Sequence, residues 1–281
     1  MLATLVIVFR EIIEAGLIVG IVLAASRGVR ARGLWVGYGV AGGVLGACLV
    51  AAFAGQLGAL FEGVGQELFD AAILLLAVVM LTWHNVWMAS HGRAMAREMS
   101  EVGAAVAAGE RPLFALAIVV GVAVLREGSE IVLFLYGIAE AGGASAVSML
   151  IGGAFGLAGG VAVSALMYFG LLAVPAHRLF AVTSGLITLL AAGLAAQAVV
   201  FLQQAGYINT LTETVWNTSG LLSQDSIVGR LLHTLIGYSD RPNGAQLVAY
   251  IAVVVAIVTL MKIVHASHSR QRSEKRALPA G

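Results

Sequence analysis

The 281-residue chain has few charged residues and almost no cysteine. Lysine, arginine, aspartate and glutamate make up only 11% of its residues, whereas a typical soluble domain has about 25%. Too few polar side chains remain to cover a surface that faces water, so composition predicts that lipid is the solvent. The single cysteine, Cys48, excludes a disulfide framework and a thiolate-rich metal site. The N-terminus also lacks the basic region of a secretory signal peptide.

Hydrophobic residues account for 60% of the chain and gather in apolar stretches long enough to cross a bilayer. We expect an all-α polytopic membrane protein with seven transmembrane helices. They cover approximately residues 3–25, 34–60, 68–89, 113–139, 146–173, 179–203 and 246–266. A single transmembrane domain would then occupy residues 1–266, and residues 267–281 would form a basic cytoplasmic tail that interacts with the lipid surface.

The charges between the spans are distributed unevenly. Basic residues follow spans one, three and five and fill the tail, whereas only Arg230 and Arg241 belong to the opposite side. The positive-inside rule therefore places the N-terminus outside and the C-terminus in the cytoplasm. Acidic residues show the reverse bias, and four of them are candidates for an outer approach that concentrates cations. These are Glu62, Glu67, Asp70 and Glu140. The alternative is that short loops simply need some polar residues.

Two halves of the chain carry the same landmarks in the same order. R-E-I-I-E at residues 10–14 is matched by R-E-G-S-E at residues 126–130. Glycine ladders follow in span two, at 39–46, and in span five, at 152–160. Three spans per half predict an inverted 3+3 repeat, about 1–90 and 111–204, with span seven as an addition. We also expect spans two and five to cross closely over their ladders, because glycine lets backbones approach.

Each charged motif places its ionisable groups on one face of a helix. Glu11 and Glu14 are three residues apart, and Arg10 lies four residues before Glu14 on the same side. Span four repeats this geometry with Arg126, Glu127 and Glu130. An ionisable side chain in mid-membrane costs about 2.5–3.5 kcal/mol, so these groups need partners, which the inverted repeat would supply. We predict that the four glutamates bind a metal ion near the midplane, supported by the two arginines. The alternative is an ion-pair knot that only joins two helices, although buried ion pairs stabilise weakly.

With these features the sequence resembles the oxidase-dependent high-affinity iron permeases, which include yeast ferric permeases and bacterial elemental-iron-uptake permeases. The resemblance extends over nearly the whole chain, through "MLTWHNVWM", "LLAAGLAAQAVVFLQQAG", "LLSQDSIVGRLLHTLIGY" and "RPNGAQL". It implies an iron permease of the bacterial inner membrane rather than an enzyme. Iron would be its substrate, with no prosthetic group and no nucleic-acid partner. It also implies ferric ion, supplied by a separate oxidase or iron-capture protein on the outer face.

Other functions remain open at this point. Carboxylates distinguish metal ions poorly, so a permease for manganese or lead fits the same residues. An intramembrane di-iron carboxylate enzyme fits less well, because such sites typically include Glu-x-x-His. No G-x-x-x-x-G-K-[ST] sequence occurs, which excludes direct use of ATP.

Two further features depart from a simple permease pattern. His84 occupies a position where the resemblance leads us to expect an apolar residue. It is either an accessory ligand or proton acceptor near the inner exit, or a capped histidine at the membrane interface, which we favour. The outer segment 205–245 is long for a connector, and apolar residues at helical spacing predict an amphipathic helix there. We favour a covering loop over a docking surface for an iron-delivering partner.

Overall fold

The computed structural model describes residues 1–59, 66–140, 145–170, 176–224 and 226–277, and it contains helices but no strand within these ranges. The helices are α1 (Leu2–Ala25), α2 (Arg32–Ala59), α3 (Gln66–Ala107), α4 (Phe114–Glu140), α5 (Ala146–Tyr168), α6 (Ala176–Gln204), α7 (Ile227–Ile236) and α8 (Gly244–Ala277). α3 and α8 both extend well beyond the predicted spans, and α8 includes much of the predicted tail. The all-helical prediction is therefore confirmed.

Within the described ranges, five helices are long and apolar enough to cross a membrane. Their candidate spans are Arg32–Ala54, Glu67–Met88, Ala146–Tyr168, Phe180–Gln204 and Gly244–Val264. α1 and α4, with 24 and 27 residues, are also long enough to cross a membrane, but each carries the three charged residues of a motif near its middle. A count of seven spans requires that α1 and α4 also cross the membrane with their charged residues shielded from lipid. The count stays a prediction.

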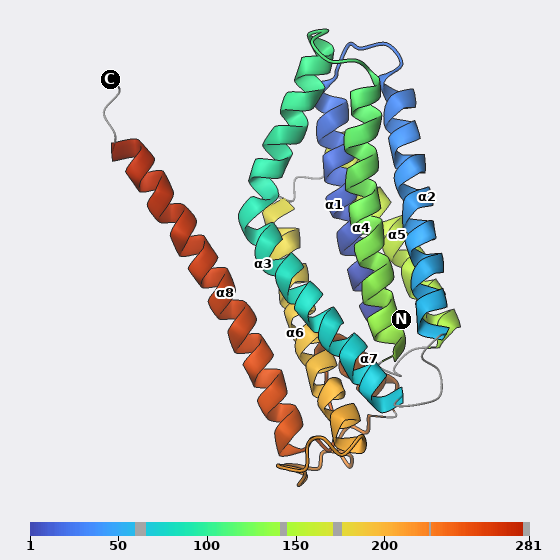
Figure 1. Cartoon of the computed structure of the whole chain (residues 1–281), viewed down its shortest axis with the longest axis vertical. Coiled ribbons are helices and arrows are strands. Elements are labelled where there is room, and N and C mark those ends of the chain that lie inside the picture. Colours follow the sequence, from blue (N-terminus) through green and yellow to red (C-terminus); the bar gives the residue numbers. More distant parts are fainter. Residues whose placement is uncertain (60–65, 141–144, 171–175, 225, 278–281) are drawn as a thin grey trace.

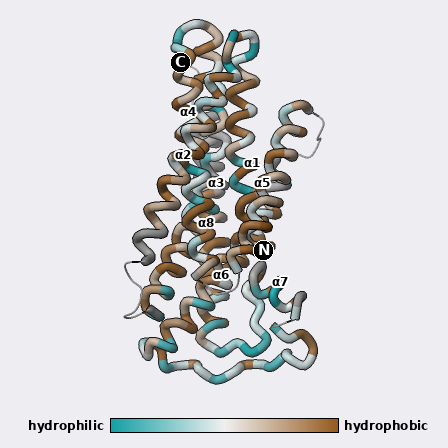
Figure 2. Tube along the Cα trace, turned by 90° about the vertical axis from the view of Figure 1, so that its right-hand side faces the viewer, coloured by the Kyte–Doolittle hydropathy of each residue, from teal (hydrophilic) through white to brown (hydrophobic). Residues whose placement is uncertain are grey.

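The long helices run between two ends of the molecule (Figure 1). The α1–α2 connection, the α3–α4 connection and the C-terminal end of α8 lie at one end, whereas α7 and the chain around it lie at the other. Hydrophilic residues gather at both ends (Figure 2). The first end carries Arg27, Arg30 and Arg111, and the second carries Arg230 and Arg241. This segregation of charge is what the predicted orientation requires.

The glycine ladders pack against the motif helices and not against each other. α2 lies along α4, and α5 lies along α1. A Cβ atom on Gly43 would come within 2.7 Å of the Gly121 carbonyl oxygen, and one on Gly156 would come within 2.7 Å of the Leu5 carbonyl oxygen. The prediction that spans two and five cross over their ladders is therefore wrong. A ladder shows that a backbone approaches closely, but its sequence does not say which backbone that is.

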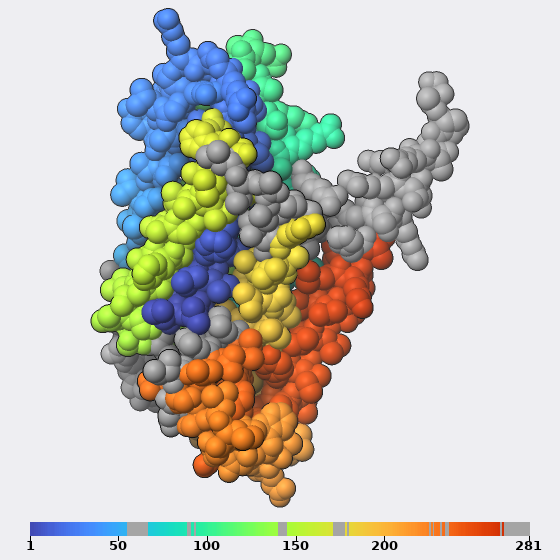
Figure 3. Space-filling model, turned by 180° about the vertical axis from the view of Figure 1, so that it is seen from behind, coloured from blue at the N-terminus to red at the C-terminus, as the bar shows by residue number. Residues whose placement is uncertain are grey.

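The charged motifs form a polar layer between two apolar clusters. One cluster includes Ile7 of α1 and Phe134 of α4, on the side of α7. The other includes Ile18 of α1 and Val120 of α4, on the side of the α1–α2 connection. Residues 10–14 and 126–130 lie between these positions on their helices. The motifs are therefore enclosed at both ends by packed side chains. In the space-filling view from behind, α5 lies along α1, the helix of the first motif (Figure 3).

A short helix, α7, lies in the segment where the sequence predicts one. It begins after Ser226, whose hydroxyl accepts a hydrogen bond from the Gly229 backbone N–H at 2.9 Å. It ends at Gly237, which adopts the left-handed conformation with φ 69°. Serine caps and left-handed glycines are the usual boundaries of a short helix, so local sequence explains both ends.

Candidate metal site

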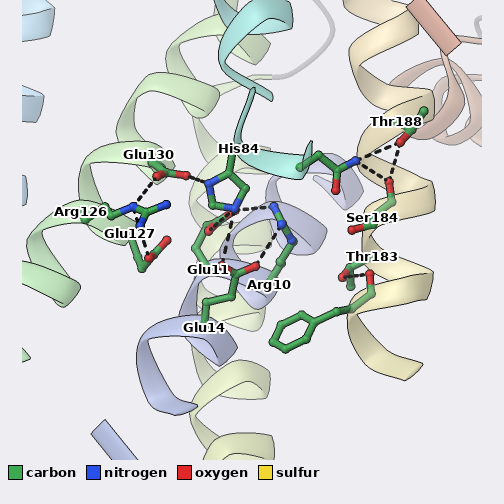
Figure 4. Close-up of polar contacts among 12 residues, drawn as sticks. Arg10, Glu11, Glu14, His84, Arg126, Glu127, Glu130, Thr183, Ser184 and Thr188 are labelled. Carbon is green, nitrogen blue, oxygen red and sulfur yellow. Dashed lines mark hydrogen bonds and ion pairs between the residues drawn. The ribbon is translucent and has the colours of Figure 1, made fainter. Parts of the chain in front are cut away.

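The first motif is fully buried on α1, where one arginine binds two glutamates. Arg10 Nη1 lies 3.2 Å from Glu11 Oε1, and Arg10 Nη2 lies 3.0 Å from Glu14 Oε1 (Figure 4). The Arg10 side chain is only 2% exposed. A planar guanidinium can reach two carboxylates at once through separate nitrogens. Arg10 therefore takes one oxygen from each glutamate and leaves the Oε2 atom of each for other partners.

The second motif on α4 has the same order of residues but a looser geometry. Arg126 Nε lies 3.2 Å from Glu130 Oε1 and 3.8 Å from Glu127 Oε1. The Arg126 side chain is 32% exposed, and its guanidinium carbon lies 4.2 Å from the centroid of the Trp87 ring. Trp87 in turn stacks on His91, with ring centroids 5.0 Å apart. The two motifs are therefore not equivalent: one arginine is enclosed, and the other is partly covered by an aromatic side chain.

His84 of α3 lies between the two motifs (Figure 4). Its Nδ1 atom contacts Glu130 Oε2, and its Nε2 atom lies 3.7 Å from Glu11 Oε2 and 3.6 Å from Glu14 Oε2. The ring packs edge-on against Phe134, with centroids 6.2 Å apart. His84 is 3% exposed. One imidazole thus contacts carboxylates from both motif helices.

Several carboxylate oxygens at this point are buried without a hydrogen-bond partner among the described residues. They are Glu11 Oε2, Glu14 Oε2 and both Glu127 oxygens. Buried polar atoms without partners are rare, because each costs about 1–3 kcal/mol. One ligand atom each from Glu11, His84, Glu127 and Glu130 can be chosen so that all four lie within 4.8 Å of one another. A cation at this place would contact oxygen atoms that otherwise have no partner.

The structure brings the four predicted glutamates and both arginines into one cluster, which is buried except for the partly exposed Arg126. It leaves the predicted outer approach less defined. Glu67 is exposed and Asp70 is buried, both near the start of α3. Glu140 is the last residue of α4, and only its backbone is described. Glu62 lies outside the described residues.

The favoured interpretation of His84, a capped histidine at the membrane interface, is wrong. α3 continues to Ala107, so residue 84 lies in the middle of the helix, and its side chain is buried against the motifs. The sequence reasoning also missed Asn85, whose Nδ2 donates to the Ser184 carbonyl oxygen at 3.1 Å and to Thr188 Oγ1 at 3.0 Å. The adjacent polar residues His84 and Asn85 inside an apolar stretch could have indicated this. They point in different directions from the helix, so each needs a polar partner on a different neighbouring helix.

Comparisons with known proteins agree on one family. The chain matches the model of the iron permease FTR1 family over residues 1–272. The ferrous iron permease EfeU of Escherichia coli O6:K15:H31 (strain 536 / UPEC) is 31% identical over 278 residues, which is 97% of this chain and 100% of that protein. The ferrous iron permease EfeU of Yersinia pestis is 30% identical over 264 residues, covering 92% of this chain and 93% of that protein. No solved structure matches.

Proposed function

Because this chain belongs to the iron permease FTR1 family, we propose that it moves an iron ion across the bacterial inner membrane through a carboxylate site between α1 and α4. The family resemblance found in the sequence is confirmed, and so is the expectation of an integral membrane permease that is not an enzyme. Iron is then the transported substrate and not a prosthetic group. The alternative of an intramembrane di-iron enzyme is set aside on the same ground.

One observation carries the proposed site: among the described residues, Glu11 Oε2, Glu14 Oε2 and both Glu127 oxygens are buried without a hydrogen-bond partner. Glu11, Glu14, Glu127 and Glu130 would supply carboxylate oxygens to the ion. The arginines would bind the opposite oxygens, as Arg10 does with Glu11 and Glu14. This arrangement fixes the carboxylates before the ion arrives and keeps part of their charge neutralised. An ion held by partly neutralised carboxylates can leave again, which transport requires.

The proposed path assumes seven spans in an inverted 3+3 arrangement plus α8, with the N-terminus outside. Two facts support it. The charges of α1 and α4 are turned into the bundle and paired there, so these helices can cross lipid despite their motifs. The packing also follows the repeat: if α1–α3 of the first half are exchanged with α4–α6 of the second, the pair α2–α4 becomes the pair α5–α1, and both pairs are observed.

The ion would enter at the end that carries α7 and the start of α3, past Glu67 and Asp70, with Glu62 and Glu140 as further members of the approach. A separate oxidase or capture protein would act at that end.

Uptake of radioactive iron into proteoliposomes tests this proposal. Glu11→Gln and Glu127→Gln each remove the charge of one ligand while keeping its shape, and we expect uptake to fall to background. Glu101→Gln is the matched control, because that side chain is 67% exposed and pairs only at the surface with Arg97. Near-normal uptake by either motif variant, at equal insertion, would contradict the site. Manganese or lead taken up in preference to iron would favour the alternative substrates.

A further inference from the structure

His84 is the group of this site that a purely carboxylate mechanism does not use. It is buried, it contacts both motifs, and its Nε2 atom has no hydrogen-bond partner among the described residues. We propose that His84 Nε2 is a ligand of the transported ion, and that this nitrogen makes the site selective for ferrous iron over hard divalent ions such as manganese. The inference rests on the proposed function and deepens it, because it names the residue that selects the ion; ferrous iron is the ion in the names of the relatives from Escherichia coli and Yersinia pestis.

The contacts of His84 suit a metal-bound imidazole. Its Nδ1 atom contacts Glu130 Oε2, and Arg126 Nε lies 3.2 Å from the other oxygen of that carboxylate. Metal-binding histidines almost always donate their second ring N–H to a carboxylate or carbonyl oxygen, which fixes the tautomer and the ring orientation. With the Nδ1 proton on the Glu130 side, the lone pair of Nε2 points toward Glu11 and Glu14.

The rest of α3 keeps this ring in place. Asn85, the next residue, is buried and donates to Thr188 Oγ1 and the Ser184 carbonyl oxygen of α6. Successive helix residues are about 100° apart around the axis, so a bond from Asn85 to α6 fixes which way His84 faces. The Phe134 side chain of α4 packs edge-on against the His84 imidazole. The imidazole is therefore held by three helices before any ion binds, which is the preorganisation that a selective site needs.

The chemistry of a mixed site differs from that of four carboxylates. Carboxylate oxygens suit magnesium, calcium and manganese, whereas imidazole nitrogen suits iron, nickel, copper and zinc. For a given site with nitrogen and oxygen ligands, ferrous iron also binds more tightly than manganese. One nitrogen among the oxygens therefore shifts preference away from the abundant hard ions.

The charge of the cluster favours a divalent ion. If the four carboxylates and two guanidiniums are ionised and the histidine is neutral, as a metal ligand must be, the cluster has a net charge of −2. A ferrous ion makes this layer neutral, whereas a ferric ion leaves one positive charge between two apolar clusters. Uncompensated charge in such surroundings is costly. This reasoning departs from the ferric ion that the sequence resemblance implies, and with it from an oxidase as the supplying partner; a capture protein remains compatible with it.

X-ray absorption at the iron edge tests the ligand directly. The purified full-length protein in detergent is loaded anaerobically with ferrous iron and compared with His84→Gln. We expect the outer-shell scattering of an imidazole in the wild type and its loss in the variant. His91→Gln is the control on the same helix, because the His91 side chain is exposed and stacks on the Trp87 ring; its spectrum is expected to match the wild type. The wild-type spectrum decides whether a histidine binds the ion, and the comparison of His84→Gln with His91→Gln decides which histidine it is.

Uptake from mixtures of ferrous iron and manganese tests the selectivity. Loss of a metal-site partner changes metal affinity by about 10–100-fold, so we expect the ratio of iron to manganese uptake to fall about tenfold or more in His84→Gln. Iron bound to the wild type without imidazole scattering overturns this inference and leaves the proposed function standing. An unchanged uptake ratio in His84→Gln overturns the selectivity. A wild-type protein that neither binds nor transports iron overturns the proposed function as well.

Discussion

The guanidinium carbon of Arg126 lies 4.2 Å from the centroid of the Trp87 ring, so an aromatic side chain of α3 covers the arginine of the second motif. Trp87 is one helical turn from His84, which contacts the glutamates of both motifs. α3 therefore contributes two side chains to the site: the His84 imidazole contacts the carboxylates, and the Trp87 indole covers Arg126. Arg10 of the first motif is instead enclosed by its own two glutamates.

We expect Trp87→Leu to weaken iron binding by several-fold without abolishing transport. A cation–π contact contributes about 0.5–2 kcal/mol, and its loss would let Arg126 move away from Glu130. Initial rates of uptake at varied iron concentration measure this effect, which should appear as a raised half-saturation concentration. Trp83→Leu is the control, because Trp83 lies on the same helix but is 72% exposed on the outer face. Equal half-saturation for both variants would show that the indole does not position Arg126.

Arg10→Lys is expected to abolish most of the uptake although it keeps the positive charge. Arg10 contacts Glu11 and Glu14 through two different nitrogens at 3.2 and 3.0 Å, and a single ammonium group cannot reproduce that planar fork. Uptake at matched protein insertion is the measurement. Arg97→Lys serves as the control, since Arg97 forms an exposed pair with Glu101. Full transport by Arg10→Lys would mean that the arginine is only a counter-charge.

Gly43→Ala is expected to destabilise the protein, whereas its neighbour Gly42→Ala is not. A Cβ atom at residue 43 would lie 2.7 Å from both the Gly121 carbonyl oxygen and the Val124 Cβ atom, whereas nothing lies within 4 Å of a Cβ atom at residue 42. Forcing a methyl group into a packed interface costs about 1–3 kcal/mol. Thermal unfolding in detergent compares the two variants. If both unfold at the wild-type temperature, α2 and α4 do not pack as closely as described.

Asn85→Ala and Thr188→Ala are expected to act as one unit. The Asn85 amide donates to Thr188 Oγ1 at 3.0 Å, and Thr188 Oγ1 donates to the Ser184 carbonyl oxygen at 2.8 Å. Leaving a buried partner unsatisfied costs about 1–3 kcal/mol, so each single variant should lose stability and the double variant should lose less than the sum. A double-mutant cycle of unfolding free energies measures this coupling. Thr188→Ser keeps the hydroxyl and should behave nearly as the wild type; additive losses would contradict the shared network.

The motif geometry was predictable from sequence, but its surroundings were not. Residues four apart on a helix lie on one face, and this rule is enough to place Arg10 beside Glu14 and Arg126 beside Glu130. No such rule connects His84 to Glu11, because these residues belong to different helices and are brought together only by packing. The position of His84 was also misjudged because hydropathy ends the span near residue 89, whereas the helix continues to Ala107.

The sequence by itself determined that this protein is helical, lies in lipid and carries two charged faces, since these properties follow from composition and from spacing along one helix. Only the tertiary structure decided that α2 packs on α4 and α5 on α1, and that α3 inserts a histidine between the motifs. The physical reason is that lipid is as apolar as most of the helix surface, so burial of apolar area does not distinguish one partner from another. Partner choice depends instead on close backbone contacts and on the few polar groups that need each other, and both are properties of surfaces that meet in space.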